Sequence, residues 1–485
     1  MDNETKIIKN VFINSNGNKL YPAIIYFSDK IEKIEKLGNI EFDWDELKEQ
    51  DVKEKLIREI SPKKFSQGIN IIDGKFNLLI PGAIDPHVHF DTPGFEFRDD
   101  FEHGTTAAAY GGVTTIIDMP CTSLPPVTNK KNFEYKLNVV QKRSLVDFAF
   151  WGGVRGNDFC KTIPIEEQVR ELSELGVAGF KVYVISGMDT FTDLTYERIT
   201  EAAKAIAPTG KPMGVHAEDK FMVLTKKNEF IANNQNKWQH YCQARSSEAE
   251  ATAIENVLKA VNNIDVKTHI VHLSSQLGLE KIKRAGQKGI KITTETCPHY
   301  LYFTQKDFEN EKIGNYLKTA PPVKLQKDKD ALWQGLADGS ISFVTTDHAG
   351  TVPDKEKIAD NFWKVYGGIP GVEHRVPFLF SEGFLKGKIS LQKTIELLST
   401  NAAEYFNLKS KGRIEKDFDA DFALINLWDS KKVIAEEMHS KGKYTPFENV
   451  TFNSVVVKTF LRGKVIMNKE GEKEENIGYG KFIKS

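Results

Sequence analysis

The chain has 485 residues, of which 40% are hydrophobic and 27% are charged, so a disordered or fibrous chain is excluded and there is ample material for a buried core. Its 66 Lys and Arg residues nearly cancel its 67 Asp and Glu residues, which leaves a formal net charge of -1. No global basic field therefore favours nucleic acid or an anionic membrane as a partner. Length alone predicts about three domains, unless one of them is a large barrel.

The N-terminal residues and the cysteines favour a cytoplasmic protein. The sequence begins MDNETKIIKN, without the charged and then apolar stretches of a secretion signal, and no apolar run is long enough to span a membrane. The four cysteines lie far apart and form no C-x-x-C pair, as is typical of a reducing compartment. We therefore expect a cytoplasmic protein without membrane-spanning segments.

Both ends of the chain carry the alternating pattern of β-strands. Apolar and polar residues alternate over residues 6–37 with Asn-Gly turns, and the pattern returns at 421–428 and 455–467. Neither end has enough strands for a good sandwich alone, so we expect the two to pair in one discontinuous β domain. The charged stretch 41–64 has a helical pattern and is expected to be a surface insertion.

Between the two ends, short β-rich apolar runs alternate with amphipathic helical stretches. Eight runs can be counted, and they cover residues 78–89, 113–120, 147–154, 178–184, 211–218, 267–274, 291–298 and 340–347. Helices are expected to begin at Phe101, Asn132, Pro164, Thr195, Ser247, Leu277, Asp328 and Leu391. Eight strands alternating with helices predict parallel crossovers and a (β/α)₈ barrel. A doubly wound open sheet is the alternative fold.

Together these patterns change the expected number of domains to two. The fold class is α/β, with a (β/α)₈ TIM barrel over residues 81–406. The second unit is a small discontinuous β-sandwich domain made from residues 1–80 and 407–485.

Polar residues that can bind metals stand near the ends of several predicted strands. His87 and His89 end the first run, and residues two apart share one face of a strand. A lone H-x-H pattern is weak evidence for a metal site, because histidines on strands often serve packing. Four further runs, however, carry a polar residue at the same end: Lys181, His216, His272 and Asp347. Burying all of these unpaired would cost several kcal/mol, so packing alone explains them poorly.

The lysine is the unusual member of this set. A protonated lysine has no lone pair, but a desolvated lysine of lowered pKa can take up carbon dioxide as a carbamate that bridges two metals. We expect His87, His89, Asp347 and carboxylated Lys181 on one divalent ion, and the same Lys181 with His216 and His272 on the other. Imidazole and oxygen ligands suit Zn²⁺.

The predicted pair of ions suggests a hydrolytic reaction. Two divalent ions lower the pKa of a shared water to about 7, so that hydroxide is available at neutral pH. Asp347 is the candidate catalytic residue, because its carboxylate can take the proton and pass it to a leaving nitrogen.

Six motifs in the chain resemble those of the cyclic amidohydrolases, the family of dihydroorotase, allantoinase, hydantoinase and dihydropyrimidinase. They are H-V-H at 87–89, GFK ending at 181, HAE from 216, VHLSS around 272, ETCPHYL at 295–301 and TTDHAG around 347. The resemblance covers nearly the whole chain. It implies a binuclear metal site, a carboxylated lysine and hydrolysis of a ring amide. It also implies a small-molecule substrate and a homo-dimer or homo-tetramer.

The resemblance identifies the substrate less sharply. Dihydroorotases usually place Arg and Asn where this chain has Asp91 and Cys121, so a carboxylate substrate is expected to meet a like charge at Asp91. Hydantoinases usually have Tyr where Ser186 stands. His299 follows the seventh run and can reach the pocket. These four residues are the candidate substrate-binding residues, and we expect an allantoinase- or hydantoinase-like activity, with dihydroorotase as the alternative.

Two hypotheses from other classes compete. Some relatives of dihydropyrimidinase keep the fold as non-catalytic scaffolds after losing metal ligands, but all six ligand positions are filled here. The other hypothesis is a different reaction at the same site, such as hydrolysis of a phosphotriester or of urea, although Asp91 near the barrel mouth would disfavour anionic phosphates.

Overall fold

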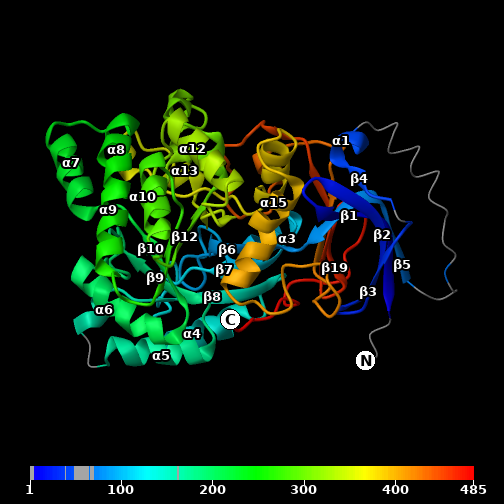
Figure 1. Ribbon diagram of the computed structural model, residues 1–485. Coiled ribbons are helices and arrows are strands. Elements are labelled where there is room, and N and C mark those ends of the chain that lie inside the picture. The colour runs from blue at the N-terminus through cyan, green and yellow to red at the C-terminus, as the bar shows by residue number, and fades with distance from the viewer. Residues whose placement is uncertain (1–4, 39, 49–64, 66–69, 161–162) are drawn as a thin grey trace.

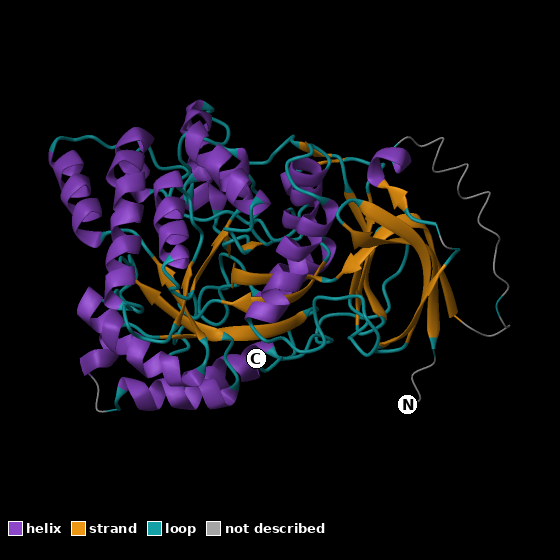
Figure 2. Cartoon of the chain, viewed as in Figure 1, coloured by secondary structure: helices purple, strands orange, loops and turns teal. Residues whose placement is uncertain are grey.

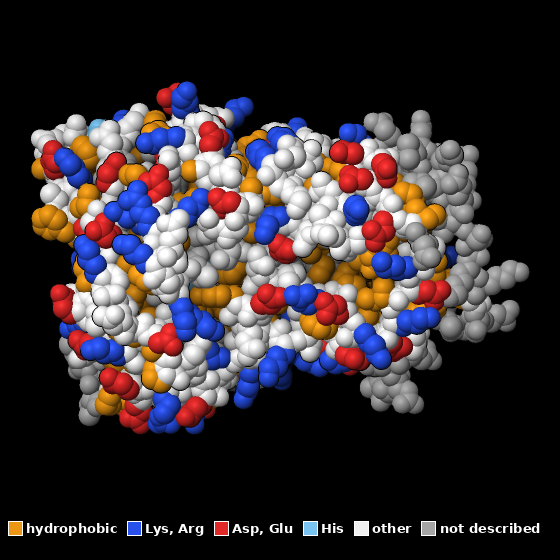
Figure 3. Space-filling model, viewed as in Figure 1, with side chains coloured by type: hydrophobic (Ala, Val, Ile, Leu, Met, Phe, Trp, Pro, Cys, Tyr) orange, Lys and Arg blue, Asp and Glu red, His pale blue; other side chains and the backbone are white. Residues whose placement is uncertain are grey.

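A computed structural model describes residues 5–38, 40–48, 65, 70–160 and 163–485. A barrel of strands wrapped by helices lies beside a curved sheet (Figure 1). Figure 2 shows the helices on the outside of the barrel strands. On the face seen in Figure 3, Lys and Arg are interspersed with Asp and Glu, in keeping with the net charge of -1.

The barrel strands run parallel in the order β13-β12-β11-β10-β9-β8-β7-β6-β14. Their bounds are β6 (Ala83–His89), β7 (Val113–Asp118), β8 (Asp147–Gly153), β9 (Gly179–Tyr183), β10 (Pro212–His216), β11 (Lys267–Ile270), β12 (Ile292–Thr296), β13 (Phe343–Val344) and β14 (His348–Ala349). Each of the eight predicted runs contains a barrel strand or most of one, and the predicted (β/α)₈ fold is confirmed.

The last predicted run, together with the two residues that follow it, closes the barrel. Within the run, β13 pairs with β12 through Phe343 and Val344. Directly after the run, β14 pairs with β6, where His348 lies opposite Val88 and Ala349 opposite His89. Because the last segment pairs with the first strand as well as with its predecessor, the sheet is closed, which excludes the open doubly wound alternative.

Helices cover the barrel in the crossovers. Their bounds are α3 (Phe101–Tyr110), α4 (Lys130–Val140), α5 (Ile165–Leu175), α6 (Tyr196–Ile206), α7 (Lys220–Ala232), α8 (Trp238–Ala244), α9 (Ser247–Ala260), α10 (Gln276–Gln287), α11 (Pro298–Tyr302), α12 (Gln326–Ala337), α13 (Pro353–Glu356), α14 (Arg375–Phe378), α15 (Leu391–Ile395) and α16 (Asn401–Tyr405). Side chains at N-cap positions explain several starts, because Asp100, Asn129 and Ser246 each accept a hydrogen bond from a first-turn amide.

The crossover between β10 and β11 is longer than predicted. The sequence pattern predicts one helix there, and the structure adds α7 and α8 before α9. Only Val223 and Phe230 of α7 are buried, so this helix lacks the wide apolar stripe by which a sequence pattern reveals a helix.

The strands of both chain ends form one mixed sheet in the order β19-β18-β15-β5-β1-β2-β3, with β4 beside β2. The N-terminal strands are β1 (Lys6–Asn16), β2 (Lys19–Phe27), β3 (Ile31–Lys36), β4 (Phe42–Asp43) and β5 (Asn70–Pro81), and the C-terminal ones are β15 (Phe422–Asn426), β18 (Val455–Leu461) and β19 (Lys464–Asn468). Antiparallel pairing of β5 with β15 joins the two ends. A small separate sheet contains β16 (Lys431–Lys432) and β17 (Thr451–Phe452).

The predicted insertion and the predicted domain boundaries concern the two ends of the chain. The predicted insertion at 41–64 begins with β4 and the short helix α1 (Trp44–Leu47), and residues 49–64 lie outside the described part of the chain. The domain boundaries at 80 and 406 stay a prediction. The last residues of the chain lie against the barrel, where the amides of Phe148 and Ile483 bond across to Lys481 and Phe148.

Within the described residues, no helix combines the length and the apolar character that crossing a bilayer requires. Cys121, Cys242 and Cys297 are buried free thiols.

A buried cluster of charges ties the barrel to the end sheet. The Lys411 ammonium lies 2.7 Å from Asp147, which begins β8, and 2.6 Å from Asp421, which precedes β15. Asp419 lies 3.0 Å from the same nitrogen, and Arg462 also contacts Asp147. Burial lowers the pKa of Lys411, but the surrounding carboxylates outweigh burial and raise it above its usual value.

Replacement of this ammonium is expected to destabilise the fold. Lys411→Met leaves buried carboxylates without their shared cation, so we expect the free energy of unfolding to fall by about 3–5 kcal/mol, measured from urea unfolding midpoints. Lys409, an exposed neighbour, offers a matched control. Lys409→Met is expected to change the free energy of unfolding by less than about 0.5 kcal/mol. Equal stability of the two variants would refute the role of the cluster.

Candidate active site

The six predicted metal ligands come together at the carboxyl ends of the barrel strands. His87 and His89 lie on β6, Lys181 on β9 and His216 at the end of β10. His272 and Asp347 lie just beyond the ends of β11 and β13. This is the end of a parallel barrel where catalytic residues gather, because all strands deliver their last residues to the same mouth.

His87, His89 and Asp347 form one half of the cluster. Their candidate ligand atoms all lie within 4.8 Å of one another. Asp347 Oδ1 lies 3.1 Å from His87 Nε2 and 3.2 Å from His89 Nε2. Three ligand atoms at this spacing can converge on one cation.

His216 and His272 form the other half. Their facing ring nitrogens, His216 Nδ1 and His272 Nε2, lie 2.9 Å apart. The ring of His272 lies 5.5 Å from the ring of His87, centroid to centroid, so the two halves adjoin.

Two buried nitrogen atoms in the cluster, Lys181 Nζ and His272 Nδ1, have no hydrogen-bond partner within the described part of the chain. Burial lowers the pKa of Lys181, and neighbouring Asp347 only partly opposes this. Unpartnered buried nitrogens are costly unless something else binds them. The donor set of imidazoles, a carboxylate and a lysine of lowered pKa therefore fits divalent metal ions.

Backbone strain accompanies the site. His272 has φ 40° and Asp347 has φ 48°, in the left-handed region that non-glycine residues seldom adopt. Asp91, just beyond β6, has φ 50°. Such conformations persist where the surrounding fold enforces them and are frequent at functional sites.

Glu295, which sequence reasoning did not assign, holds two of the histidine rings. At the end of β12, its carboxylate contacts His87 Nδ1 directly and lies 3.1 Å from His269 Nε2. It also accepts a hydrogen bond from the amide of His272 at 3.3 Å. Burial raises the pKa of Glu295, but His87 and His269 outweigh it and hold the pKa well below its usual range. An ionised Glu295 thus fixes the orientation of His87.

Glu218 likewise fixes the orientation of His216, in the other half of the cluster. Its Oε2 lies 3.0 Å from His216 Nε2 and contacts Arg245. Although burial opposes ionisation, Arg245 and His216 lower the pKa of Glu218 to about 2. Glu295 begins the motif ETCPHYL, and Glu218 ends the motif HAE. Spacing along the chain does not reveal which histidine ring each carboxylate contacts.

A cavity of about 210 Å³ opens over the cluster, large enough for a small ring. Cys121 and Ser186, two of the four candidate substrate-binding residues, line it. Asp91 and His299 are buried outside this lining. Asp91 is thus not among the residues that line the cavity, and burial and neighbouring Asp99 raise its pKa.

Tyr183, which the sequence analysis did not single out, lines the same cavity. Its ring stacks on His216 with centroids 5.2 Å apart, and its hydroxyl lies 3.2 Å from Cys121 Sγ. His348 turns away from the cluster, since its Nε2 lies 2.8 Å from Asp99.

Loss of the Glu295 charge is expected to weaken metal binding. Glu295→Gln removes the carboxylate that orients His87, so we expect a 10–100-fold lower affinity for divalent metal, measured by competition with a chelator. Glu309→Gln, on an exposed carboxylate, is the matched control and should leave affinity unchanged. Unchanged affinity in both variants would contradict the role of Glu295.

Comparison with known proteins identifies relatives along most of the chain. The family described as "Amidohydrolase family" matches residues 78–466. An allantoinase of Bacillus licheniformis is 35% identical and aligns over 84% of this chain and 90% of its own. A dihydroorotase of Methanosphaera stadtmanae is also 35% identical, over 82% of this chain and 87% of its own. The solved L-hydantoinase (dihydropyrimidinase) of Arthrobacter aurescens superposes with a TM-score of 0.87 at 28% identity, covering 99% of both chains.

Proposed function

Because the chain belongs to the amidohydrolase family, we propose that it hydrolyses a ring amide bond of a small cyclic substrate with the help of divalent metal ions. The observation that carries this proposal is the joint presence of the histidine, aspartate and lysine cluster at the mouth of the barrel and of allantoinase and hydantoinase relatives. A scaffold without activity has no physical need for buried, unpartnered nitrogens at this place.

In this proposal His87, His89, Asp347 and Lys181 hold one metal ion, and Lys181, His216 and His272 hold the other. Two bound divalent ions, which we propose to be Zn²⁺, supply a lowered pKa for water and polarise the ring carbonyl. Lys181 would serve as a carbamate, since its lowered pKa favours the neutral amine that attacks carbon dioxide and then loses a proton.

The residues of the chain supply position and proton transfer. Although burial opposes it, His87 and His89 hold the pKa of Asp347 well below its usual range, so its carboxylate is ionised at neutral pH. Asp347 lines the cavity and can take a proton from the attacking water and deliver it to the ring nitrogen that leaves. Tyr183 and Cys121 present a hydroxyl and a thiol for orienting the ring.

We propose an allantoin-like or hydantoin-like ring as the substrate. Allantoinase relatives at 35% and 34% identity and the hydantoinase structure support this choice. Dihydroorotate is the second candidate, because a dihydroorotase relative is 35% identical and Asp91 does not face the cavity. We further propose that the protein is cytoplasmic, as the widely separated cysteines favour, and that it assembles as a homo-dimer or homo-tetramer, as the family resemblance implies.

Metal content tests the first step of this proposal. Purified active protein is expected to contain up to two equivalents of transition metal per chain, measured by elemental analysis, because two groups of ligands converge. Activity in protein shown to contain no metal would refute it.

Lys181→Ala tests the bridging role. The variant loses the nitrogen that forms the carbamate, so we expect activity to fall by more than about a hundredfold. This exceeds the loss that is typical when a residue that only orients a metal ligand is replaced. Short carboxylic acids such as acetate should restore part of it, whereas a short amine, the matched control, should not. Full activity without added acid would be incompatible with this role.

A hydrolysis assay with allantoin, hydantoins, dihydropyrimidines and dihydroorotate decides the substrate. We expect the highest kcat/KM for allantoin or a hydantoin, because several relatives that align over most of this chain are allantoinases. Preference for dihydroorotate would establish the second candidate in its place.

A further inference from the structure

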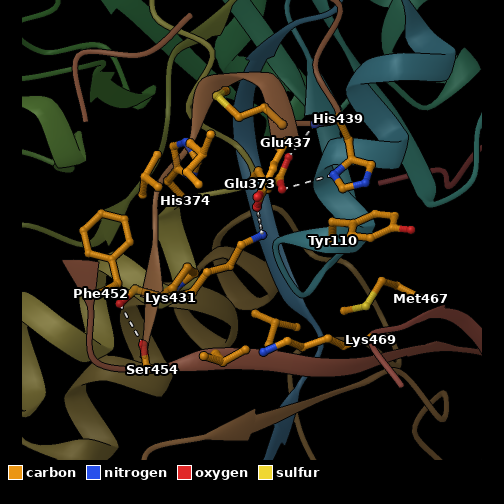
Figure 4. Close-up of a pocket in the computed structure, with 16 residues that line it drawn as sticks. Tyr110, Glu373, His374, Lys431, Glu437, His439, Phe452, Ser454, Met467 and Lys469 are labelled. Carbon is orange, nitrogen blue, oxygen red and sulfur yellow. Dashed lines mark hydrogen bonds and ion pairs between the residues drawn. The ribbon is translucent and has the colours of Figure 1, made fainter. Parts of the chain in front are cut away.

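A partly open cavity of about 140 Å³ lies apart from the strand-end site, at the seam between the barrel and the end strands. Figure 4 shows Tyr110, from the end of α3, and Met467, from β19, facing His374 and Phe452 across it. His374 stands at the start of α14, and Phe452 belongs to β17. Elements far apart in the sequence therefore build this cavity jointly.

The walls are mainly apolar, and the charged groups among them have partners. Val433, Met438 and Val456 add to the apolar lining. Glu373 accepts a hydrogen bond from the His439 amide at 2.8 Å, and its other oxygen lies 3.1 Å from His439 Nδ1.

The remaining carboxylate and ammonium groups of the lining are also paired. Lys431 lies 3.8 Å from Glu437, and Lys469 lies 3.5 Å from Asp429. A charged ligand would find no unpaired group of opposite charge in the lining. Burying its charge among apolar side chains would therefore cost free energy. The cavity therefore favours an uncharged ligand.

His374 supplies one unused hydrogen-bonding atom. Its side chain lines the cavity, the residue is only 6% exposed, and its Nε2 has no hydrogen-bond partner among the residues that the structure describes. Burial lowers the pKa of His374 to about 4, so the ring is neutral at pH 7 and can donate or accept one hydrogen bond. A buried polar atom without a partner is a place where a ligand gains a bond that water cannot easily supply.

We propose that this cavity is a binding site for a small phenol, a neutral and largely apolar ring that carries one hydroxyl group. An apolar cavity of about 150 Å³ holds one benzene molecule, so a single substituted ring fits the space. Apolar walls bury the ring, and the hydroxyl group bonds His374 Nε2. The site is independent of the proposed hydrolysis, since none of its lining residues belongs to the metal cluster.

Titration of the full chain with phenol and with toluene tests the proposal. Calorimetry is expected to give one saturable phenol site per chain, and toluene, which lacks the hydroxyl, should bind about fivefold to tenfold more weakly. His374→Phe should reduce the phenol affinity by the same factor and leave the toluene affinity within about twofold. His374→Gln, which keeps a hydrogen-bonding group, should restore most of the phenol affinity.

Two further variants locate the binding. His299→Phe is the matched control, because His299 Nε2 is also buried and unpartnered but lies outside this cavity, and it should not alter phenol binding. Val433→Trp fills the cavity and should abolish binding of both ligands. Absence of saturable phenol binding, or equal phenol affinity in the wild type and His374→Phe, would overturn the proposal and indicate a cavity occupied by solvent alone.

Discussion

Closure of the barrel by residues 343–349 is the constraint on which the site depends. This segment pairs with β12 at its start and with β6 at its end. Asp347 lies between the two pairings, which carries its carboxylate to within 3.2 Å of both His87 and His89. Residues about 260 positions apart therefore meet through backbone hydrogen bonds, and Thr346 adds to them by donating to buried Asp85 at 2.6 Å. An open sheet would separate Asp347 from these histidines.

Around this closure the fold buries charged side chains. Glu295 and Glu218 are buried and ionised, and each fixes the ring of a histidine in the cluster. Such carboxylates set which ring nitrogen faces the cavity, so the ligand atoms are aligned before any ion arrives. The strained backbone at Asp347 is held by the strand pairings that precede and follow it. Stability and function are thus coupled at the mouth of the barrel.

Much of the fold follows from local patterns. Alternating apolar runs and amphipathic stretches predict the barrel strands and most of its helices, because each element must bury its own apolar face. The pattern failed at α7, where little of the helix is buried, and it gave no sign that β5 pairs in parallel with β1. Strand partners in the end sheet depend on long-range pairing, which spacing along the chain does not encode.

The sequence by itself determined the type of fold, the amidohydrolase resemblance and the six residues that converge at the strand ends, because strand ends and residue chemistry are local properties. Only the tertiary structure decided which neighbours orient them, since Glu295 meets His87 across 208 positions of the chain. It also placed Cys121 and Ser186 on the cavity wall and left Asp91 and His299 behind it. Whether the side chain of a loop residue faces the cavity depends on how distant elements pack against the loop. That packing is set only when the barrel closes.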